Sequence, residues 1–147
     1  MAKVTYCNTE KPKLVWYLAV AGAAIVLIMG TLVAAGVIAV LPFFYFSWFL
    51  IYVFLMTADY LLRKVTVDDE ADTLVTNANK KYPMRISNIS YIKYKTNKKG
   101  KFKSLFIHDN GVKFLDIRTK KVNADAIVSQ LLEDNPSIDL QYVTNHI

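Results

Sequence analysis

The feature that most constrains this chain is a run of 45 residues without a charge, from Leu14 to Ala58. About 20 consecutive apolar residues are enough for one helix to cross a bilayer, so this run is long enough for two crossings. Inside a bilayer, helices satisfy their own backbone hydrogen bonds. The run therefore predicts two transmembrane helices, over residues 14–37 and 43–62, joined by a short turn between Gly36 and Pro42. A single long helix kinked at Pro42 is the alternative, because proline fits the first turn of a helix but disrupts its interior.

The apolar run predicts three parts: an N-terminal arm over residues 1–13, a transmembrane hairpin over 14–62 and a water-exposed domain over 63–147. Hydrophobic residues make up 54% of the chain, against about 45–50% in soluble domains. The first apolar segment is far longer than the core of a cleaved signal peptide, and a second segment follows it directly. We therefore interpret it as a retained anchor.

The basic residues that flank the hairpin predict its orientation. Lys3, Lys11 and Lys13 precede it, Arg63 and Lys64 follow it, and the connecting turn carries no charge. The positive-inside tendency then places both termini in the cytoplasm, in an integral protein of the inner (cytoplasmic) membrane. Aromatic and basic side chains are expected at the two membrane interfaces: Trp16, Tyr17, Tyr60 and Arg63 at the inner one, and Phe43, Phe44, Tyr45 and Trp48 at the outer one.

Asp59 is the acidic residue closest to the apolar run, four residues before Arg63, where the two side chains can pair on one helix face. The run contains no second acid and no histidine, which disfavours a transporter. Small residues at four-residue spacing, such as Ala19 and Ala23, permit close helix contacts. Those contacts can lie within the hairpin or with another subunit.

The pattern changes to short strands after Arg63. Apolar and polar residues alternate at period two, as in half-buried strands. Turns are predicted at Asp68–Asp72, at Asn97–Gly100 and at Asp109-Asn110-Gly111, where Asn-Gly between apolar strands indicates a hairpin. The strands between them are expected in the stretches KVTVDD, TLVTN, MRISNISYIKYKT, KSLFIHD and VKFLDI.

The last predicted element is an amphipathic helix. Its apolar residues fall on one face: Ala124, Ile127, Val128, Leu131 and Leu132. Asn123 is the expected N-cap, Val122 and Ile127 are spaced as a hydrophobic staple, and Asn135-Pro136 ends the helix. The predicted fold class is α+β: a two-helix transmembrane hairpin followed by a small antiparallel β-barrel or sheet capped by a C-terminal helix.

Three stretches resemble the bacterial pleckstrin-homology-like (PH-like) domains that follow one or two membrane helices. YLLRKVTVDDEADTLVTN is similar to the opening tyrosine and first hairpin of the family. RISNISYIKY is similar to its Ile-x-x-Ile segment, and NADAIVSQLLEDNPSI to its closing helix. The closing helix lacks the aromatic residue often found there. The resemblance covers about residues 60–138 and implies a barrel-like sheet capped by a helix, with a binding or scaffolding role and no shared ligand.

The sequence offers little for catalysis. His108 and His146 are far apart and lie in no metal-binding pattern, and the acidic stretch Asp68–Asp72 lacks the glycine and distal glutamate of a calcium loop. Cys7 is the single cysteine, so no intramolecular disulfide is possible. We interpret it as a reduced thiol, with acylation or redox sensing as the alternatives. No phosphate-binding glycine loop and no nucleophile motif is present. We therefore expect no enzyme activity, no cofactor and no metal.

The strongest remaining feature is a basic stretch. Residues 80–103 contain nine Lys and Arg residues and no acid. The candidate binding residues for lipid or a partner are Lys80, Lys81, Lys93, Lys95, Lys98, Lys99, Lys101 and Lys103. Anionic lipid attracts each basic residue near a membrane by about 1 kcal/mol. The alternative is a set of solvated lysines that protect strand edges from pairing.

Together these features predict a non-catalytic two-pass membrane protein whose cytoplasmic PH-like domain docks partner proteins or anionic lipid. A small accessory subunit of a larger membrane enzyme or transporter is the alternative. The expected partners are membrane lipids and either a protein partner or further copies of the chain, as a homo-oligomer. The membrane anchor disfavours nucleic acid.

Overall fold

The computed structural model describes residues 3–111 and 113–144. The chain forms two compact units. One is a helical hairpin over Thr9–Leu62, and the other combines the residues up to Asn8 with those from Arg63 onward. Each unit has its own internal contacts.

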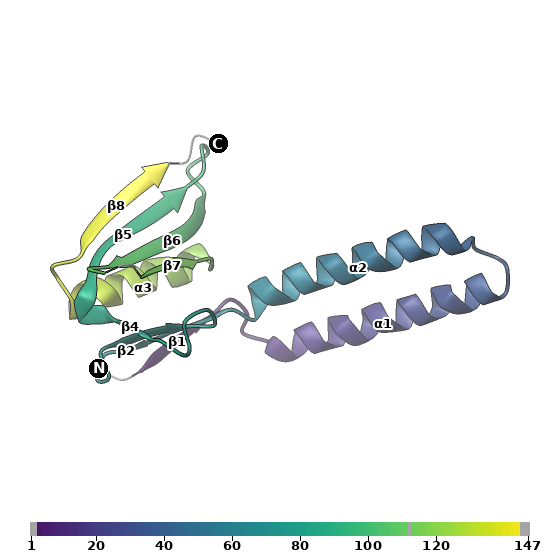
Figure 1. Ribbon diagram of the computed structural model, residues 1–147, viewed down its shortest axis with the longest axis horizontal. Helices are drawn as coiled ribbons and strands as arrows, with labels where there is room; N and C mark the ends of the chain where they lie inside the picture. Colours follow the sequence, from purple (N-terminus) through teal and green to yellow (C-terminus); the bar gives the residue numbers. More distant parts are fainter. Residues whose placement is uncertain (1–2, 112, 145–147) are drawn as a thin grey trace. The chain divides into compact units, whose positions relative to one another are not determined.

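The helical unit consists of α1 (Pro12–Ala34) and α2 (Val40–Leu61), which are antiparallel neighbours (Figure 1). Both are long and apolar enough to cross a membrane. The two predicted helices are therefore present, and the chain turns between them at residues 35–39. Pro42 lies in the first turn of α2. The N–H groups of a first turn have no partner within the helix, so the N–H that proline lacks costs no hydrogen bond there. A Cβ added at Gly30 would lie 3.7 Å from the ring of Phe43, so this small residue faces the other helix.

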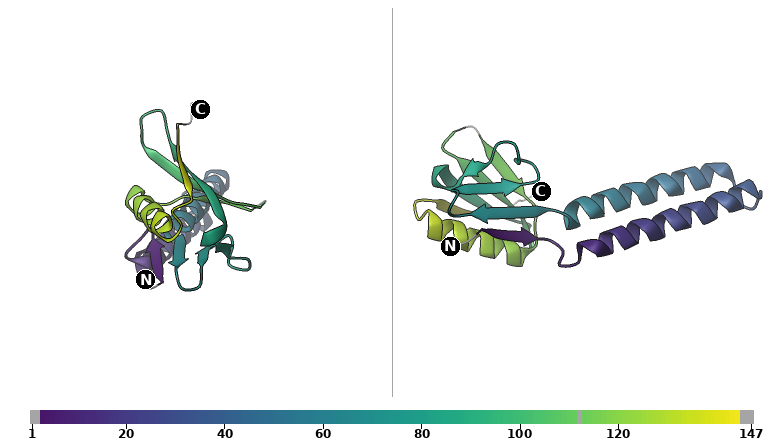
Figure 2. Two further views of the ribbon diagram at one scale, coloured as in Figure 1. Left: turned by 90° about the vertical axis from the view of Figure 1, so that its left-hand side faces the viewer. Right: turned by 90° about the horizontal axis from the view of Figure 1, so that it is seen from below.

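The first sheet of the domain has the order β1-β2-β3-β4 and is antiparallel throughout. Its strands are β1 (Val4–Cys7), β2 (Lys64–Asp68), β3 (Thr73–Thr76) and β4 (Met84–Arg85). Strand β1 comes from residues that the sequence assigned to a separate N-terminal arm. It pairs with β2 over its whole length, from Val4 opposite Val67 to Cys7 opposite Lys64 (Figure 2).

The second sheet has the order β7-β6-β5-β8. It contains β5 (Ile89–Thr96), β6 (Phe102–Asp109), β7 (Phe114–Ile117) and β8 (Asp139–Thr144), and a single 3₁₀ turn, η1 (Ile86–Asn88), leads into it. Strand β8 follows the closing helix and runs parallel to β5, so the expectation of a purely antiparallel sheet is wrong. In the described part of the chain the strands form two sheets rather than a closed barrel.

Helix α3 (Lys121–Asp134) packs against β1, β6 and η1. The predicted apolar face is confirmed, since Ala124, Ile127, Val128 and Leu131 are buried. The helix meets apolar side chains from both sheets in one core: Val65, Val67, Leu74, Met84, Ile92, Leu105, Ile107, Leu115 and Ile117. The α+β fold class is therefore confirmed.

The predicted start of this helix is wrong. The N-cap is Lys120, and Asn123 lies inside the first turn, where its Nδ2 donates to the Cys7 carbonyl at 2.8 Å. Val122 is 78% exposed and makes no hydrophobic staple. The Asn123 side chain therefore stabilises the tertiary structure by a hydrogen bond that joins α3 to β1, although asparagine is also a common N-cap residue.

The pairing of β1 with β2 makes the helical hairpin an insertion between two neighbouring strands. The Asn8 N–H donates to the Arg63 carbonyl at 3.4 Å, so the chain leaves the domain and returns to it at adjacent positions. The domain is consequently built from both flanks of the apolar run. It cannot be isolated as residues 63–147 without losing β1.

Candidate docking surface

The lysine-rich turn between β5 and β6 is built around Asn97. Its side-chain Oδ1 accepts the backbone N–H groups of Lys99 and Lys101, each at 2.9 Å, and its carbonyl accepts that of Gly100, also at 2.9 Å. Gly100 adopts φ +72°, a left-handed conformation that glycine accommodates without strain. The predicted turn is thus confirmed, and its geometry is held by one amide side chain.

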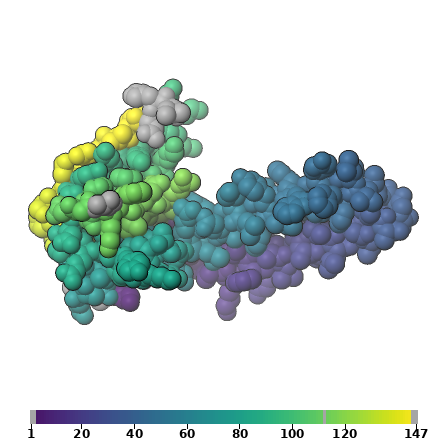
Figure 3. Space-filling model, viewed as in Figure 1, coloured from purple at the N-terminus to yellow at the C-terminus, as the bar shows by residue number. Residues whose placement is uncertain are grey.

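The four lysines of this turn, Lys98, Lys99, Lys101 and Lys103, are exposed. We call them the tip lysines. Lys95 pairs with Ser104 and Thr96 pairs with Phe102, so Lys103 is the extra residue of a β-bulge. The end of the β5–β6 hairpin projects from the domain surface (Figure 3). The tip therefore presents four ammonium groups to solvent on a fixed turn.

The remaining candidate lysines lie elsewhere, so the basic stretch does not form one patch. Lys80 and Lys81 are exposed in the loop between β3 and β4. Lys93 and Lys95 alternate along β5 with the buried Ile92 and Tyr94, which places both lysines on the sheet face away from the core.

That outer face of the second sheet carries aromatic rings in contact with lysines. The rings of Tyr91 and His108 stack at 4.9 Å, and those of Phe106 and Phe114 stack at 5.4 Å. Lys93 lies 5.2 Å from the centre of the Tyr91 ring. None of these four rings was predicted from the sequence as a binding residue. Lys95 lies 4.6 Å from the Phe106 ring.

The strand registers arrange this face in three rows across β7, β6, β5 and β8. The first row is Phe114, His108, Tyr91 and Asp139, and the second is Asp116, Phe106, Lys93 and Gln141. The third contains Lys95, Val143 and Ser104, of which Ser104 is buried, and lies beside Arg118, the residue after β7. Figure 1 views this sheet from the side away from α3, and no other strand or helix of the described domain lies over it. We call these residues the outer face.

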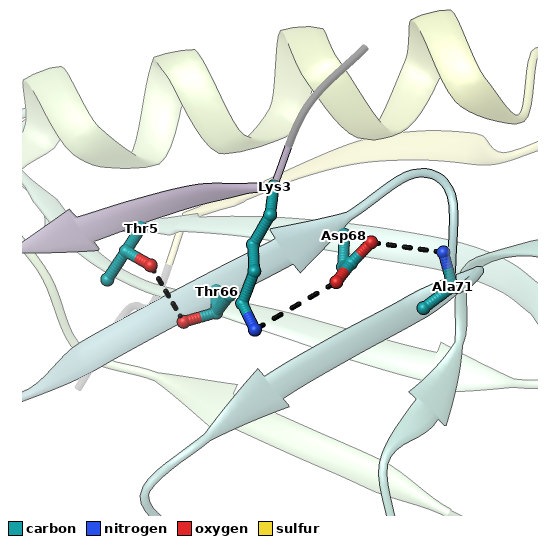
Figure 4. A network of polar contacts seen from close by, with 5 residues as sticks. All are labelled: Lys3, Thr5, Thr66, Asp68 and Ala71. Carbon is teal, nitrogen blue, oxygen red and sulfur yellow. Dashed lines mark hydrogen bonds and ion pairs between the residues drawn. The ribbon is translucent and has the colours of Figure 1, made fainter.

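The acidic turn after β2 has a structural role. Asp68 accepts the Ala71 N–H at 3.0 Å and lies 4.0 Å from the Lys3 ammonium, beside the hydrogen bond between Thr5 and Thr66 (Figure 4). Asp72, at φ +52°, accepts the backbone N–H and the hydroxyl of Ser87. Among the described residues, no group of three or more acidic, histidine or cysteine side chains could hold a metal ion.

A second polar network joins β1, this turn and α3. The Tyr6 hydroxyl donates to Gln130 Oε1 at 2.7 Å, and Gln130 Nε2 donates to Asp69 Oδ1 at 2.8 Å. Asp69 also shares a hydrogen bond with Asp134. Desolvation, this hydrogen bond, and the charges of Asp69 and Glu133 raise the pKa of Asp134 from 3.8 to about 6. Burial and the charges of Asp69 and Asp134 raise the pKa of Tyr6.

Asn8 is the most buried polar residue of the domain, at 1% exposure. Its Oδ1 accepts the Thr119 hydroxyl at 2.5 Å and the Lys120 N–H at 3.2 Å, and its Nδ2 donates to the Arg118 carbonyl at 3.3 Å. These bonds fix the end of β1 against the chain that leads into α3. A single asparagine in an N-terminal arm gives no sequence signal for this role.

The predicted interface residues Trp16 and Tyr17 lie near the start of α1 and are 69% and 70% exposed. Tyr60 is near the end of α2, at the same end of the hairpin, and Arg63 follows it. Trp48 lies eight residues after the start of α2, about 12 Å along the helix at 1.5 Å per residue, which is deeper than the expected interface position. The interface roles stay predictions.

Three other residues were considered for chemistry: Cys7, His108 and His146. Cys7 is a half-buried free thiol in β1. His108 stacks on Tyr91, and its Nδ1 is covered from solvent without a hydrogen-bond partner in the described part of the chain. His146 lies outside the described residues.

Comparison with known proteins adds one partial likeness. No protein-family model and no curated protein matches the sequence. A solved structure described as "Structure of the Spt16D Pob3N heterodimer" shares 9% identity over 58% of this chain, with a TM-score of 0.42, and this chain covers about half of it (48%). At that TM-score the likeness carries no argument about fold or function. The resemblance to PH-like domains therefore stays a prediction from the sequence.

Proposed function

We propose that this chain is a two-pass membrane protein whose cytoplasmic domain is a non-catalytic docking module for the anionic membrane surface. The observation that carries the proposal is the pairing of β1 with β2 around the apolar hairpin. Because of this pairing, the two segments that flank the apolar hairpin belong to one folded domain, while the hairpin itself is long and apolar enough to cross a bilayer.

The pairing supports the topology. If α1 and α2 cross the membrane, both flanks return to the same side, as the β1–β2 ladder requires. That side also carries the basic flanking residues Lys3, Lys11, Lys13, Arg63 and Lys64, while the turn at residues 35–39 has no charge. The positive-inside tendency then supports a cytoplasmic location for the domain.

The tip lysines support the docking role. Each basic residue near an anionic leaflet contributes about 1 kcal/mol, so four together provide a useful but salt-sensitive attraction. The anchor keeps the domain near the membrane, so a weak attraction is enough to orient it. Lys80 and Lys81 lie on a separate loop and are expected to contribute less than the tip.

The test uses a joined domain in which a short Gly-Ser linker connects Asn8 to Arg63 in place of the hairpin. The adjacent ends make this connection geometrically feasible. Sedimentation with vesicles measures binding, with and without anionic lipid. We expect binding to anionic vesicles at low salt, loss of binding at high salt, and no binding to neutral vesicles.

Changing all four tip lysines to serine should abolish binding. The matched control changes four other exposed lysines, Lys64, Lys113, Lys120 and Lys121, and should retain most of it although the net charge is the same. An equal loss of vesicle binding in the two variants would mean that net charge alone, and not the position of the lysines, determines binding. Absence of binding by the unchanged domain at low salt would refute the lipid-docking role.

A further inference from the structure

The outer face of the second sheet differs from an ordinary solvent-facing sheet surface. An antiparallel sheet covered on one side usually presents polar residues on the other. Here, three strands contribute Tyr91, Phe106, His108 and Phe114, and Phe114 is 61% exposed. Aromatic residues are enriched in the centres of protein interfaces.

The charges on this face narrow the class of partner. Lys93, Lys95 and Arg118 are balanced in part by Asp116 and Asp139, with Arg118 lying 3.8 Å from Asp116. Within the described chain, Lys93 and Lys95 contact rings and have no carboxylate partner. The two aspartates would repel a purely acidic or phosphate-rich partner. They would not repel a partner surface of mixed charge.

We infer that the outer face binds the same face of a second copy of this chain. The inference rests on the proposed membrane anchoring, which confines the copies to one surface. A two-fold axis along the strands places β6 of one copy over β5 of the other and keeps the rows in line. Phe106 then faces Lys93 of the second copy, His108 faces Tyr91, and Asp116 faces Gln141.

This arrangement brings no like charges together. The other in-plane axis, across the strands, would place Lys93 against Lys93 and Asp116 against Asp116. The first arrangement also offers Lys93 a ring on the second copy, that of Phe106, in place of or in addition to the Tyr91 ring that it contacts within its own sheet. Such cation–π contacts are stronger where the interface excludes water.

The expected dimer is weak in solution. Four strands about 4.8 Å apart and three rows about 6.8 Å apart give roughly 400 Å² per copy, or roughly 800 Å² in total. Stable interfaces bury about 1,200–2,000 Å². Confinement raises the effective concentration of the partner, so this area is sufficient in a membrane although it is small for free domains.

The test is cross-linking of the full chain in membranes. In a Cys7→Ser background, Lys95→Cys places a thiol on β5, next to the proposed axis, with the small Ser104 of the second copy opposite. Facing sheets pack about 10 Å apart, within reach of a short bis-maleimide. Ser129→Cys, exposed on α3, is the matched control.

We expect a dimer adduct at position 95 and at least fivefold less at position 129. Adding Phe106→Lys, which faces Lys93 of the second copy, should reduce the adduct at 95 at least fivefold. Adding Val122→Lys, at an exposed site on α3, should leave it unchanged.

No adduct at position 95 would overturn the inference and leave the face to a different partner. Equal adducts at 95 and 129, or an adduct insensitive to Phe106→Lys, would also overturn it, because random collision or another interface would then explain the cross-link. Alkaline carbonate extraction of the same membranes tests the anchoring separately. Release of the chain would contradict the proposed anchoring without changing what the cross-link says about the face.

Discussion

Asn8→Ala in the joined domain tests whether β1 is an integral part of the fold. The Asn8 side chain makes three hydrogen bonds, to Thr119, Lys120 and Arg118, in a site from which water is excluded. Each is worth about 0.5–1.5 kcal/mol net, which gives a loss of about 3 kcal/mol in the free energy of unfolding. The buried Thr119 hydroxyl loses its partner as well, which supports a loss of about 3 kcal/mol rather than the lower limit of about 1.5 kcal/mol for the three bonds together.

Urea and thermal unfolding followed by circular dichroism measure this loss. For a domain of this size, about 1 kcal/mol corresponds to about 4–8 °C in melting temperature, so we expect a decrease of about 12–24 °C. Thr5→Ala is the control, because its hydrogen bond to Thr66 lies on the exposed side of the same strand pair and should cost less than about 0.5 kcal/mol. If Asn8→Ala is no more destabilising than Thr5→Ala, β1 is not docked as described.

Three further predictions concern the same joined domain. Leu131→Ala should destabilise it by about 2–5 kcal/mol in urea unfolding because Leu131 is fully buried between α3 and the sheets, whereas Ser129→Ala on the exposed side should change little. The raised pKa of Asp134 means that the folded domain favours the protonated carboxyl. The stability that the domain gains from this preference is complete below about pH 3.8 and is lost as the pH rises through about 6. Asp134→Asn should flatten the stability–pH curve in that window, by less than about 1 kcal/mol because the side chain is exposed and screened; an unchanged curve would contradict the shift. Gly100→Ala should cost about 1 kcal/mol because φ is +72° there, and Gly100→Asn should recover much of the loss, since asparagine tolerates this conformation; equal stability of all three forms would argue against the turn.

Local patterns predicted much of the fold. The apolar run predicted both helices, and period-two alternation predicted β2, β3, β5, β6 and β7. Helical spacing of apolar residues predicted the buried face of α3. In each case burial on one face leaves a periodic pattern in the residues themselves.

Three strands were not predicted as separate elements. Strand β4 was part of the single predicted stretch MRISNISYIKYKT, in which η1 separates it from β5. The other two, β1 and β8, have partners that are distant along the chain. Strand β1 is four residues long and pairs with β2 across the whole hairpin, and β8 pairs with β5 in parallel. Exposed Val4, Thr5 and Tyr142 give them no clear apolar alternation. Their position is decided by tertiary contacts such as those of Asn8 and Tyr6, which no local pattern encodes.

The candidate site was predicted only in part. The basic composition identified the tip lysines, but it also grouped them with Lys93 and Lys95, which lie on the sheet face. The signal for the outer face was present in the alternation of Phe106 and His108 with Leu105 and Ile107. It became interpretable only when the registers placed these rings beside Tyr91 and Phe114.

Cysteine accessibility in intact cells tests the membrane topology most directly. Cys7 is half-buried, so exposed positions in a Cys7→Ser background are better reporters: Val37→Cys in the turn between the helices and Ser129→Cys on α3. With an impermeant maleimide, we predict labelling at position 37 in intact cells and labelling at position 129 only after permeabilisation. Labelling at 129 from outside, or none at 37, would contradict a hairpin that crosses the membrane with the domain in the cytoplasm.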